Sequence, residues 1–310
     1  MSSLSRRPRV GSASDPGARL PASSWRLGLL GHPVGHSVSP AIHEAALAAC
    51  GLTGSYALCD VADEAALDAK CLALQRLEYQ GFNVTLPHKL AAARRCTVLE
   101  GVAAELGVVN TLVPAAGGIA GYNTDADGLV ASIREGLPGA GERLAGRAAL
   151  VLGAGGAAYA AVFAAFALGA REVRIWNRTS ERAREIAARL GPRVVCSDDR
   201  LAAAAGVGAI FQAGSGGMGL LAGTAPYEAL VAEAAAVVGA SAADAWLVDL
   251  VYRPRATPWV RAAGLTGRAA LDGLGMLVHQ AALAFALWTG HTPPTAPLWR
   301  AAEAALVTRG

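Results

Sequence analysis

Lysine is almost absent from this chain: two of its 310 residues are lysines, against 25 arginines. Arginine keeps its proton at any workable pH, whereas a partly desolvated lysine can release it, so the two are not interchangeable where protons move. One of the two lysines, Lys89, ends the segment Asn83-Val84-Thr85-Leu86-Pro87-His88-Lys89. A lysine kept at this place in an arginine-rich chain marks Lys89 as a candidate for proton transfer.

Asparagine is also scarce, and each asparagine lies in a short polar cluster that interrupts apolar sequence. The four are Asn83, Asn110, Asn123 and Asn177. Rare polar residues grouped in this way indicate sites with demanding hydrogen-bond geometry. The alternative is that they lie in turns, where asparagine is common.

Cysteines are few and form no metal-binding or disulfide pattern. Their number is odd, no Cys-x-x-Cys pair occurs, and the five are Cys50, Cys59, Cys71, Cys96 and Cys196. The spacing supports neither a zinc site nor a disulfide framework, and it fits a reducing cytoplasm. We therefore expect no metal and a cytoplasmic protein.

Excess charge and long apolar runs are missing from the body of the chain. The net charge is +3, but the first 26 residues carry five arginines and one acid, so the remainder is almost neutral. This distribution argues against nucleic-acid binding. Residues 1–24, rich in Ser, Pro, Gly and Arg, are expected to form a disordered tail without the apolar core of an export signal. The longest apolar stretch, Ala157–Ala170, is too short to span a membrane.

From Arg26 onward, short apolar runs alternate with alanine-rich helical stretches, as in a parallel α/β sheet. A glycine-rich break at residues 136–141 separates two such series, and the chain becomes fully helical after Gly273. This pattern predicts a two-domain enzyme with a cleft between its α/β units. The expected strands are Arg26–Leu30, Tyr56–Val61, Gly81–Thr85, Asn110–Val113, Ala149–Leu152, Glu172–Trp176, Val194–Cys196, Ala209–Gln212 and Trp246–Val251.

The strand at Ala149–Leu152 leads into the turn Gly153-Ala154-Gly155-Gly156-Ala157 and then a long helix. Such a turn lets the backbone approach a pyrophosphate at the helix N-terminus. The next strand ends in Asn177-Arg178-Thr179-Ser180, with Arg182 one turn further. Arginine here accommodates the 2′-phosphate of NADP, where an NAD site would favour an acid. The alternative is a solvated helix start that bears two arginines.

Two serines mark the end of the first strand. Ser37 and Ser39 are two residues apart, so in an extended segment both hydroxyls face one side, next to the helix that Pro40 begins. Two hydroxyls beside a helix N-terminus suit a small carboxylate. Ser39 alone is equally well explained as the N-cap of that helix.

Polar clusters at later strand ends complete the candidate site. Asn83 with Thr85, Asn110-Thr111 and Asn123-Thr124-Asp125 all follow apolar runs, and polar residues at strand ends face the crevice where α/β sheets bind ligands. Asp125 and Lys89 would form an acid/base couple that moves a hydroxyl proton. Alternatively, Asp125 is the N-cap of the following helix.

Taken in order, these motifs resemble those of the shikimate dehydrogenases, the NADP-dependent enzymes of aromatic amino-acid biosynthesis. The resemblance covers nearly everything from Leu27 to Gly290. Its pieces are His36-Ser37-Val38-Ser39-Pro40, Asn83-Val84-Thr85 with Pro87 and Lys89, Val109-Asn110-Thr111, Asn123-Thr124-Asp125, Gly153–Ala157, Asn177-Arg178-Thr179, Asp249-Leu250-Val251-Tyr252 and the run from Asp272 to Gln280.

The resemblance implies roles for these residues. Lys89 and Asp125 would be the catalytic pair, and Ser37 and Ser39 would hold the substrate carboxylate. The ring hydroxyls would be bound by Asn83, Thr85, Asn110 and Gln280, with Tyr252 near the substrate and with Met218 and Gly273 near the cofactor.

The resemblance also implies an α/β fold. It would have an N-terminal substrate domain (25–124 and 273–310), a Rossmann-like, doubly wound NADP-binding domain (125–272) and C-terminal helices that return to the substrate domain.

One segment departs from the family pattern. Where Asn-Ala-Thr-Ser is usual, this chain has Gln212-Ala213-Gly214-Ser215. Glycine in place of threonine is expected to loosen the loop, and either to weaken cofactor binding or to change how the nicotinamide half is held. A quinate/shikimate or aminoshikimate dehydrogenase and a non-catalytic NADP-binding protein remain alternatives, and the chain is expected to be a monomer or a homodimer that binds a small-molecule substrate.

Overall fold

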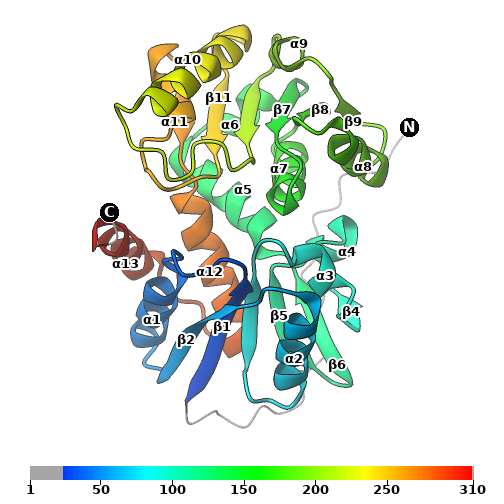
Figure 1. Ribbon diagram of the computed structural model, residues 1–310, viewed down its shortest axis with the longest axis vertical. Coiled ribbons are helices and arrows are strands. Elements are labelled where there is room, and N and C mark those ends of the chain that lie inside the picture. Colours follow the sequence, from blue (N-terminus) through cyan, green and yellow to red (C-terminus); the bar gives the residue numbers. More distant parts are fainter. Residues whose placement is uncertain (1–23, 309–310) are drawn as a thin grey trace.

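The computed structural model describes residues 24–308 and shows two α/β units, one above the other, linked by the helices α5 and α12 (Figure 1). The tail expected over residues 1–24 lies, apart from Ser24, outside the described residues. Within these residues, no helix is both long and apolar enough to cross a membrane.

The lower unit is a mixed sheet of six strands in the order β2-β1-β3-β5-β6-β4. An all-parallel sheet was expected, and this is wrong because β5 runs antiparallel to both β3 and β6. The hairpin between β5 and β6 turns at Ala116-Gly117, where Gly117 has a φ of +78°. The strands are β1 (Trp25–Gly31), β2 (Gly54–Asp60), β3 (Gly81–Val84), β4 (Val98–Leu99), β5 (Thr111–Ala115) and β6 (Gly118–Tyr122).

The reversed strand matters for the site. The sequence pattern suggested that Asn110 lies at the end of a strand. Instead, Asn110 directly precedes β5. Because β5 is antiparallel to β3, its beginning lies beside the end of β3, and the Val84 amide donates to the Asn110 carbonyl at 2.7 Å. Asn110 therefore reaches the expected edge of the sheet by the opposite chain direction.

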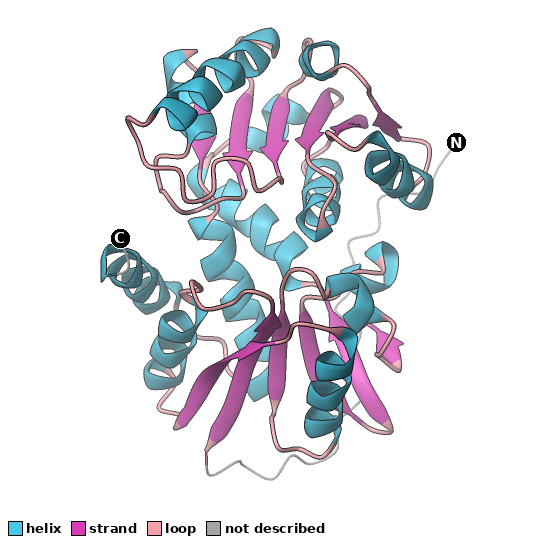
Figure 2. Cartoon of the chain, in the orientation of Figure 1, coloured by secondary structure: helices cyan, strands magenta, loops and turns pink. Residues whose placement is uncertain are grey.

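The upper unit is a parallel sheet in the order β12-β11-β10-β7-β8-β9, with helices on both faces (Figure 2). This is the doubly wound arrangement, and its strand order reverses between β7 and β10, where such sheets bind dinucleotides. The strands are β7 (Ala148–Leu152), β8 (Glu172–Trp176), β9 (Val194–Cys196), β10 (Ala209–Gln212), β11 (Trp246–Asp249) and β12 (Ala269–Leu271). The strand expected to reach Val251 thus ends at Asp249.

Helices cover both sheets and bury four apolar clusters, two for each unit. The helices of the lower unit are α1 (Ser39–Ala49), α2 (Glu64–Gln75), α3 (Lys89–Ala93), α4 (Val102–Leu106) and α13 (Thr295–Thr308). Those of the upper unit are α6 (Ala140–Leu144), α7 (Gly156–Ala167), α8 (Ser180–Leu190), α9 (Arg200–Ala204), α10 (Ala225–Ala240) and α11 (Pro258–Leu265). The linking helices are α5 (Thr124–Gly136) and α12 (Leu274–Thr289).

Helix α12 packs in one apolar cluster of each unit. Near its start Met276 packs in the cluster of the upper unit, and Phe285 packs further along in the cluster of the lower unit. The Trp288 indole donates to the Leu112 carbonyl of β5 at 3.0 Å. After α12, the chain ends with α13 packed on α1 through Leu298 and Ala302. The C-terminal helices thus return to the first sheet.

Candidate active site

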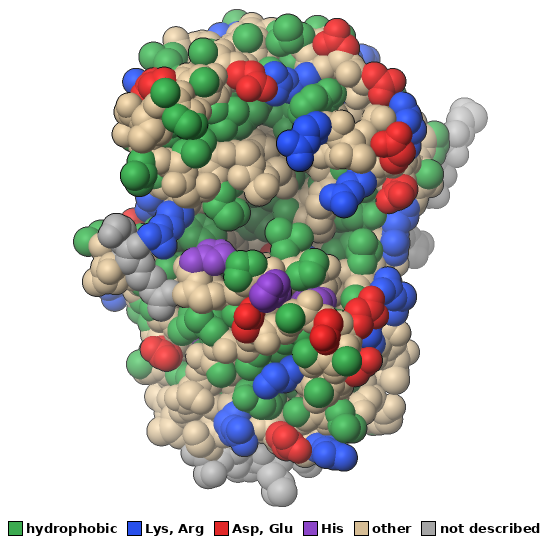
Figure 3. All heavy atoms as spheres, viewed as in Figure 1, with side chains coloured by type: hydrophobic (Ala, Val, Ile, Leu, Met, Phe, Trp, Pro, Cys, Tyr) green, Lys and Arg blue, Asp and Glu red, His purple; other side chains and the backbone are tan. Residues whose placement is uncertain are grey.

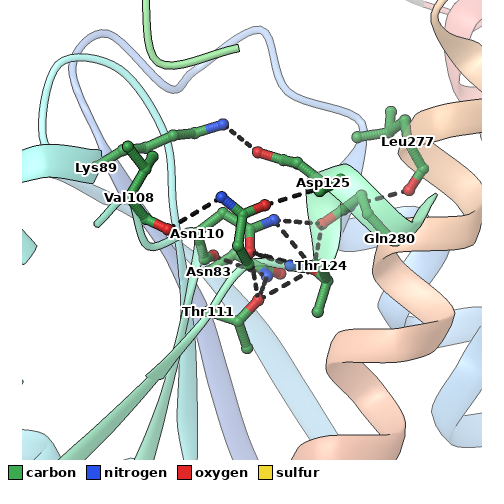
Figure 4. A network of polar contacts seen from close by, with 11 residues as sticks. Asn83, Lys89, Val108, Asn110, Thr111, Thr124, Asp125, Leu277 and Gln280 are labelled. Carbon is green, nitrogen blue, oxygen red and sulfur yellow. Dashed lines mark hydrogen bonds and ion pairs between the residues drawn. The ribbon is translucent and has the colours of Figure 1, made fainter. Parts of the chain in front are cut away.

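Lys89 and Asp125 form an ion pair at the edge where the two units meet (Figure 4). Their side chains are 11% and 9% exposed, and the Lys89 amine donates to Asp125 Oδ2. The N-cap of α5 is Asn123, whose side chain accepts from the Ala126 amide at 3.1 Å. The alternative that Asp125 caps this helix is therefore wrong, and its carboxylate faces the lysine.

Ser37 and Ser39 are buried next to each other before α1. The Ser37 hydroxyl donates to Ser39 Oγ at 3.0 Å and accepts from the Ser39 amide at 3.2 Å. The N-cap residue is Val38, with no side-chain cap hydrogen bond, and Ser39 is the first helical residue. The capping alternative for Ser39 is thus wrong, and the two hydroxyls are adjacent, as the two-residue spacing predicted.

Asn83, Asn110 and Gln280 meet in one polar network although they come from three distant segments (Figure 4). Asn110 Nδ2 donates to Gln280 Oε1 at 3.4 Å, and Asn83 Nδ2 donates to the Asn110 carbonyl at 3.2 Å. Gln280 Nε2, in the side chain, donates to the Leu277 carbonyl at 2.9 Å, within α12. The structure thus brings these three predicted substrate residues together.

Two threonines, which the sequence placed in these polar clusters without giving them a role, fix the network. Asn110 Oδ1 accepts from the Thr124 amide at 2.7 Å and from the Thr111 hydroxyl at 3.0 Å. Asn110 Nδ2 donates to Thr124 Oγ1 at 3.0 Å. These bonds allow one orientation of the Asn110 amide. Thr111 directly follows Asn110, and Thr124 directly follows Asn123. This adjacency was the only signal in the sequence that the threonines take part in the network.

An aromatic layer lies behind Asn83. The Tyr56 hydroxyl donates to Asn83 Oδ1 at 2.8 Å. The Tyr56 ring stacks on His43 with centroids 4.2 Å apart and an interplanar angle of 4°, and Trp288 lies against His43. Burial lowers the pKa of His43 to about 3, so this imidazole is neutral and acts as a flat packing surface. Tyr56 had been expected only as a strand residue.

Tyr56→Phe is expected to raise the KM for substrate about tenfold while the kcat changes little. The substitution keeps the stacked ring but leaves the buried Asn83 oxygen without its donor, which costs about 1–3 kcal/mol. Steady-state kinetics would measure this effect. Tyr79→Phe is the matched control, since the Tyr79 ring packs on Phe82 with its centroid 4.5 Å away, outside this network. Equal KM values for wild type and Tyr56→Phe would contradict the role given to the phenol.

The glycine-rich turn lies at the point where the upper sheet reverses its order. Gly153 has a φ of +106°, and a Cβ there would lie 2.7 Å from the Gly214 amide nitrogen. Helix α7 begins at Gly156 after the N-cap Gly155, and no side chain of the cap hydrogen-bonds to its first backbone amides. A Cβ at Gly156 would lie 3.2 Å from Lys89 Cδ. The turn therefore leaves room for a close ligand and lies against the lysine of the ion pair.

The end of β8 presents two exposed arginines. Asn177 Nδ2 donates to the Thr179 carbonyl at 2.8 Å and shapes the turn before α8. Arg178 and Arg182 are exposed and make no ion pair within residues 24–308. Arg184, by contrast, pairs with Asp198 at 3.1 Å and with Glu181 at 3.7 Å. The positive charge on Arg178 and Arg182 is thus available to an anion, away from the polar network.

A cleft separates the two units, and Figure 3 shows the molecule hollowed between them. A cavity of about 740 Å³ is lined by His36 of the lower unit and by Met218 and Tyr252 of the upper unit, among others. Gly273 is the N-cap of α12, and a Cβ there would lie 2.1 Å from the Leu250 carbonyl oxygen. Thr85 directly follows β3. No group of three His, Cys, Asp or Glu residues able to hold a metal occurs in the described part of the chain.

The loop that carries Tyr252 is fixed by a buried carboxyl group. Asp249 ends β11 with 0% exposure, and its Oδ1 accepts from the Val251 amide at 3.0 Å. Burial raises the pKa of Asp249 to about 7. The carboxyl group thus shapes the turn that brings Tyr252 to the cavity.

Helices α5 and α12 approach closely enough to place Gln280 because residue 128 is glycine. A Cβ at Gly128 would lie 2.7 Å from the Gln280 amide nitrogen. Gly128→Ala is therefore expected to push α12 away, to lower stability by about 1–3 kcal/mol and to raise the KM for substrate. Denaturant unfolding and steady-state kinetics measure the two effects.

Gly239→Ala in α10 is the control for this prediction. A Cβ at Gly239 meets nothing within 4 Å, so alanine there is expected to stabilise the helix slightly. If Gly128→Ala were as harmless as Gly239→Ala, the close helix contact would not position Gln280.

Three family models match successive parts of the chain. The shikimate dehydrogenase substrate binding domain matches residues 29–112, shikimate / quinate 5-dehydrogenase matches residues 139–218, and the shikimate 5′-dehydrogenase C-terminal domain matches residues 273–303. A shikimate dehydrogenase (NADP(+)) of Methylobacterium radiotolerans is 42% identical over 273 residues, which are 87% of this chain and 93% of that protein.

Solved structures agree with these matches. Shikimate 5-dehydrogenase from Thermus thermophilus, in complex with NADP(H) and shikimate, superposes with a TM-score of 0.76 at 36% identity, over 91% of this chain and 100% of that one. Quinate dehydrogenase from Corynebacterium glutamicum, in complex with NAD, gives a TM-score of 0.76 at 30% identity, over 90% and 98% of the two chains.

Proposed function

Because the chain belongs to the shikimate dehydrogenase family, we propose that it is an NADP-dependent oxidoreductase that reversibly reduces 3-dehydroshikimate to shikimate. The observation that carries this proposal is the Lys89–Asp125 pair, which lies between a polar network and the glycine-rich turn. The reaction would serve aromatic amino-acid biosynthesis, and the unpaired cysteines fit the cytoplasm.

The residues of the upper unit fit NADP. The turn from Gly153 to Ala157 would receive the pyrophosphate, because its glycines leave the α7 amides uncovered. Asn177, Arg178, Thr179 and Arg182 would surround the 2′-phosphate, and two exposed arginines suit a dianion. Met218 and Gly273 would lie near the nicotinamide.

The catalytic step needs a group that moves the proton of a substrate hydroxyl. NADP, when bound, accepts or supplies the hydride. In the oxidation of shikimate, the Lys89 amine would take the hydroxyl proton as the carbonyl forms, and in the reduction its ammonium would return that proton to the oxygen. Asp125 would hold the lysine in place and accept a hydrogen bond from the substrate. Lysine suits this role because it can exist in both protonation states.

The lower unit would bind the rest of the substrate. Ser37 and Ser39 would donate to its carboxylate, while the ring hydroxyls would meet Thr85, Asn110 and Gln280. Asn83 would act together with Asn110, and Tyr252 would close the site from the upper unit. We assign residues 25–124 and 273–310 to the substrate domain and residues 125–272 to the NADP-binding domain, with Asp125, Tyr252 and Gly273 reaching the site from the boundary between the two domains.

Quinate is the main competing substrate, since a quinate dehydrogenase shares the fold. Initial rates with NADP⁺ and with NAD⁺, each with shikimate and with quinate, separate the candidates. Fast turnover of shikimate with NADP⁺ alone is the expected result. Turnover mainly of quinate or with NAD⁺ would make the protein a paralogue. Binding of NADPH without turnover of either substrate would favour an aminoshikimate dehydrogenase or a non-catalytic role, and the same assay with aminoshikimate separates these two. Sedimentation would decide between a monomer and a homodimer.

A further inference from the structure

The loop after β10 contains three glycines in four residues, Gly214, Gly216 and Gly217, yet it has a defined hydrogen-bonded shape. Glycines lose more conformational freedom on ordering than other residues, so a loop of this composition needs bonds that hold it. The bonds come from the side chain that precedes the loop.

Gln212 is 4% exposed and uses both ends of its amide on this loop. Its Oε1 accepts from the Gly214 amide at 2.8 Å. Its Nε2 donates to the Gly214 carbonyl at 3.2 Å and to the Gly216 carbonyl at 3.1 Å. Three bonds from one buried side chain therefore fix the backbone between residues 212 and 216.

The loop lies beside the glycine-rich turn. Gln212 pairs with Leu152 in the register of β10 and β7, and the Ala213 amide donates to the Leu152 carbonyl at 2.8 Å. The Gly214 amide lies so close to Gly153 that no Cβ would fit there. Because the strand order reverses between these two strands, the loop and the turn are the two walls of the crevice where a dinucleotide binds.

We propose that Gln212 is a positioning residue for NADP, which holds the wall formed by residues 213–217 in its binding shape. This inference rests on the proposed NADP-dependent function. Gln212 and Gly214 form a matched pair, because a Cβ at Gly214 would lie 3.2 Å from Gln212 Oε1. Under this proposal the glutamine supplies the restraint that the glycine at position 214 removes, and the Kd for NADPH decides whether cofactor binding is weaker, as the sequence predicts.

The first test is fluorescence titration of NADPH into wild type and Gln212→Leu. Leucine has a similar volume but makes no hydrogen bond, so three backbone groups lose their partner and the Kd for NADPH is expected to rise about tenfold or more. Shikimate binding without cofactor is expected to stay unchanged. Gln80→Leu is the control, because Gln80 bonds the backbone of Arg26 and Leu77 in the same way within the lower unit.

A second test uses the pairing itself. Gly214→Ala alone is expected to weaken NADPH binding, because its Cβ presses on the Gln212 amide. In the Gln212→Ala background the same change is expected to strengthen binding, since the space is open and alanine narrows the backbone freedom of the loop. General destabilisation would not make Gly214→Ala weaken NADPH binding in wild type and strengthen it in the Gln212→Ala background.

The outcomes distinguish this inference from the proposed function. If wild type fails to bind NADPH, the proposed function itself is wrong. If wild type binds NADPH and Gln212→Leu binds it equally well, the positioning role is overturned. Equal losses of NADPH and shikimate binding, together with a lower Tm, would also overturn it, because Gln212 would then support the whole fold.

Discussion

Lys89→Ala is expected to lower the kcat for shikimate oxidation by about 10²–10⁴-fold, the usual effect of losing general acid/base help. The fold should survive, because the Lys89 amine contacts Asp125 in the cleft and no apolar cluster includes it. Initial rates with saturating NADP⁺ measure the loss, and circular dichroism checks the fold. A loss of less than threefold would remove Lys89 from the mechanism.

Lys89→Arg separates charge from proton transfer. Arginine keeps a positive charge beside Asp125 but does not release its proton at workable pH. We therefore expect Lys89→Arg to be nearly as inactive as Lys89→Ala. The control is Lys70→Ala, which removes the only other lysine of the chain, whose amine lies 5.4 Å from the Tyr79 ring centroid in the lower unit. That variant should keep wild-type rates.

The sequence predicted the pieces of the site better than their geometry. Motif order predicted Lys89, Asp125 and Asn110 as site residues, and the structure places all three at one edge. The sequence could not show that Asn110 lies before an antiparallel strand, because an apolar run does not specify in which direction its strand runs within the sheet. The capping alternatives for Ser39 and Asp125 failed because the backbone decides which residue is the cap: α1 has the apolar Val38 at this position, and α5 has Asn123.

Residues that act through others were the least predictable. Tyr56 looked like any strand residue, and its hydroxyl gains meaning only from Asn83, 27 positions away. Gly128 carried no signal in the sequence, but it allows the contact with Gln280. Gln212 was noticed only as a departure from a pattern. In each case the partner lies on another element or depends on loop shape, which local sequence does not encode.

Arg178→Ala is expected to raise the KM for NADP⁺ by about 10- to 100-fold and to change the KM for NAD⁺ less than twofold. A hydrogen bond to a charged group contributes about 1.5–3 kcal/mol, and only NADP⁺ carries the 2′-phosphate. Since Arg178 makes no ion pair within the described residues, its removal should leave no carboxylate unpaired. Stability should therefore stay unchanged.

Arg182 and Arg184 complete the experiment. Arg182→Ala should show a smaller effect in the same direction, because Arg182 lies one turn further along α8. Arg184→Ala is the control on the same helix: it removes an equal charge, but one that is already paired with Asp198 and Glu181. If all three variants raised the KM for both cofactors alike, the effect would come from general electrostatic attraction. A selective effect of Arg178 on NADP⁺ would instead identify the residue that recognises the 2′-phosphate.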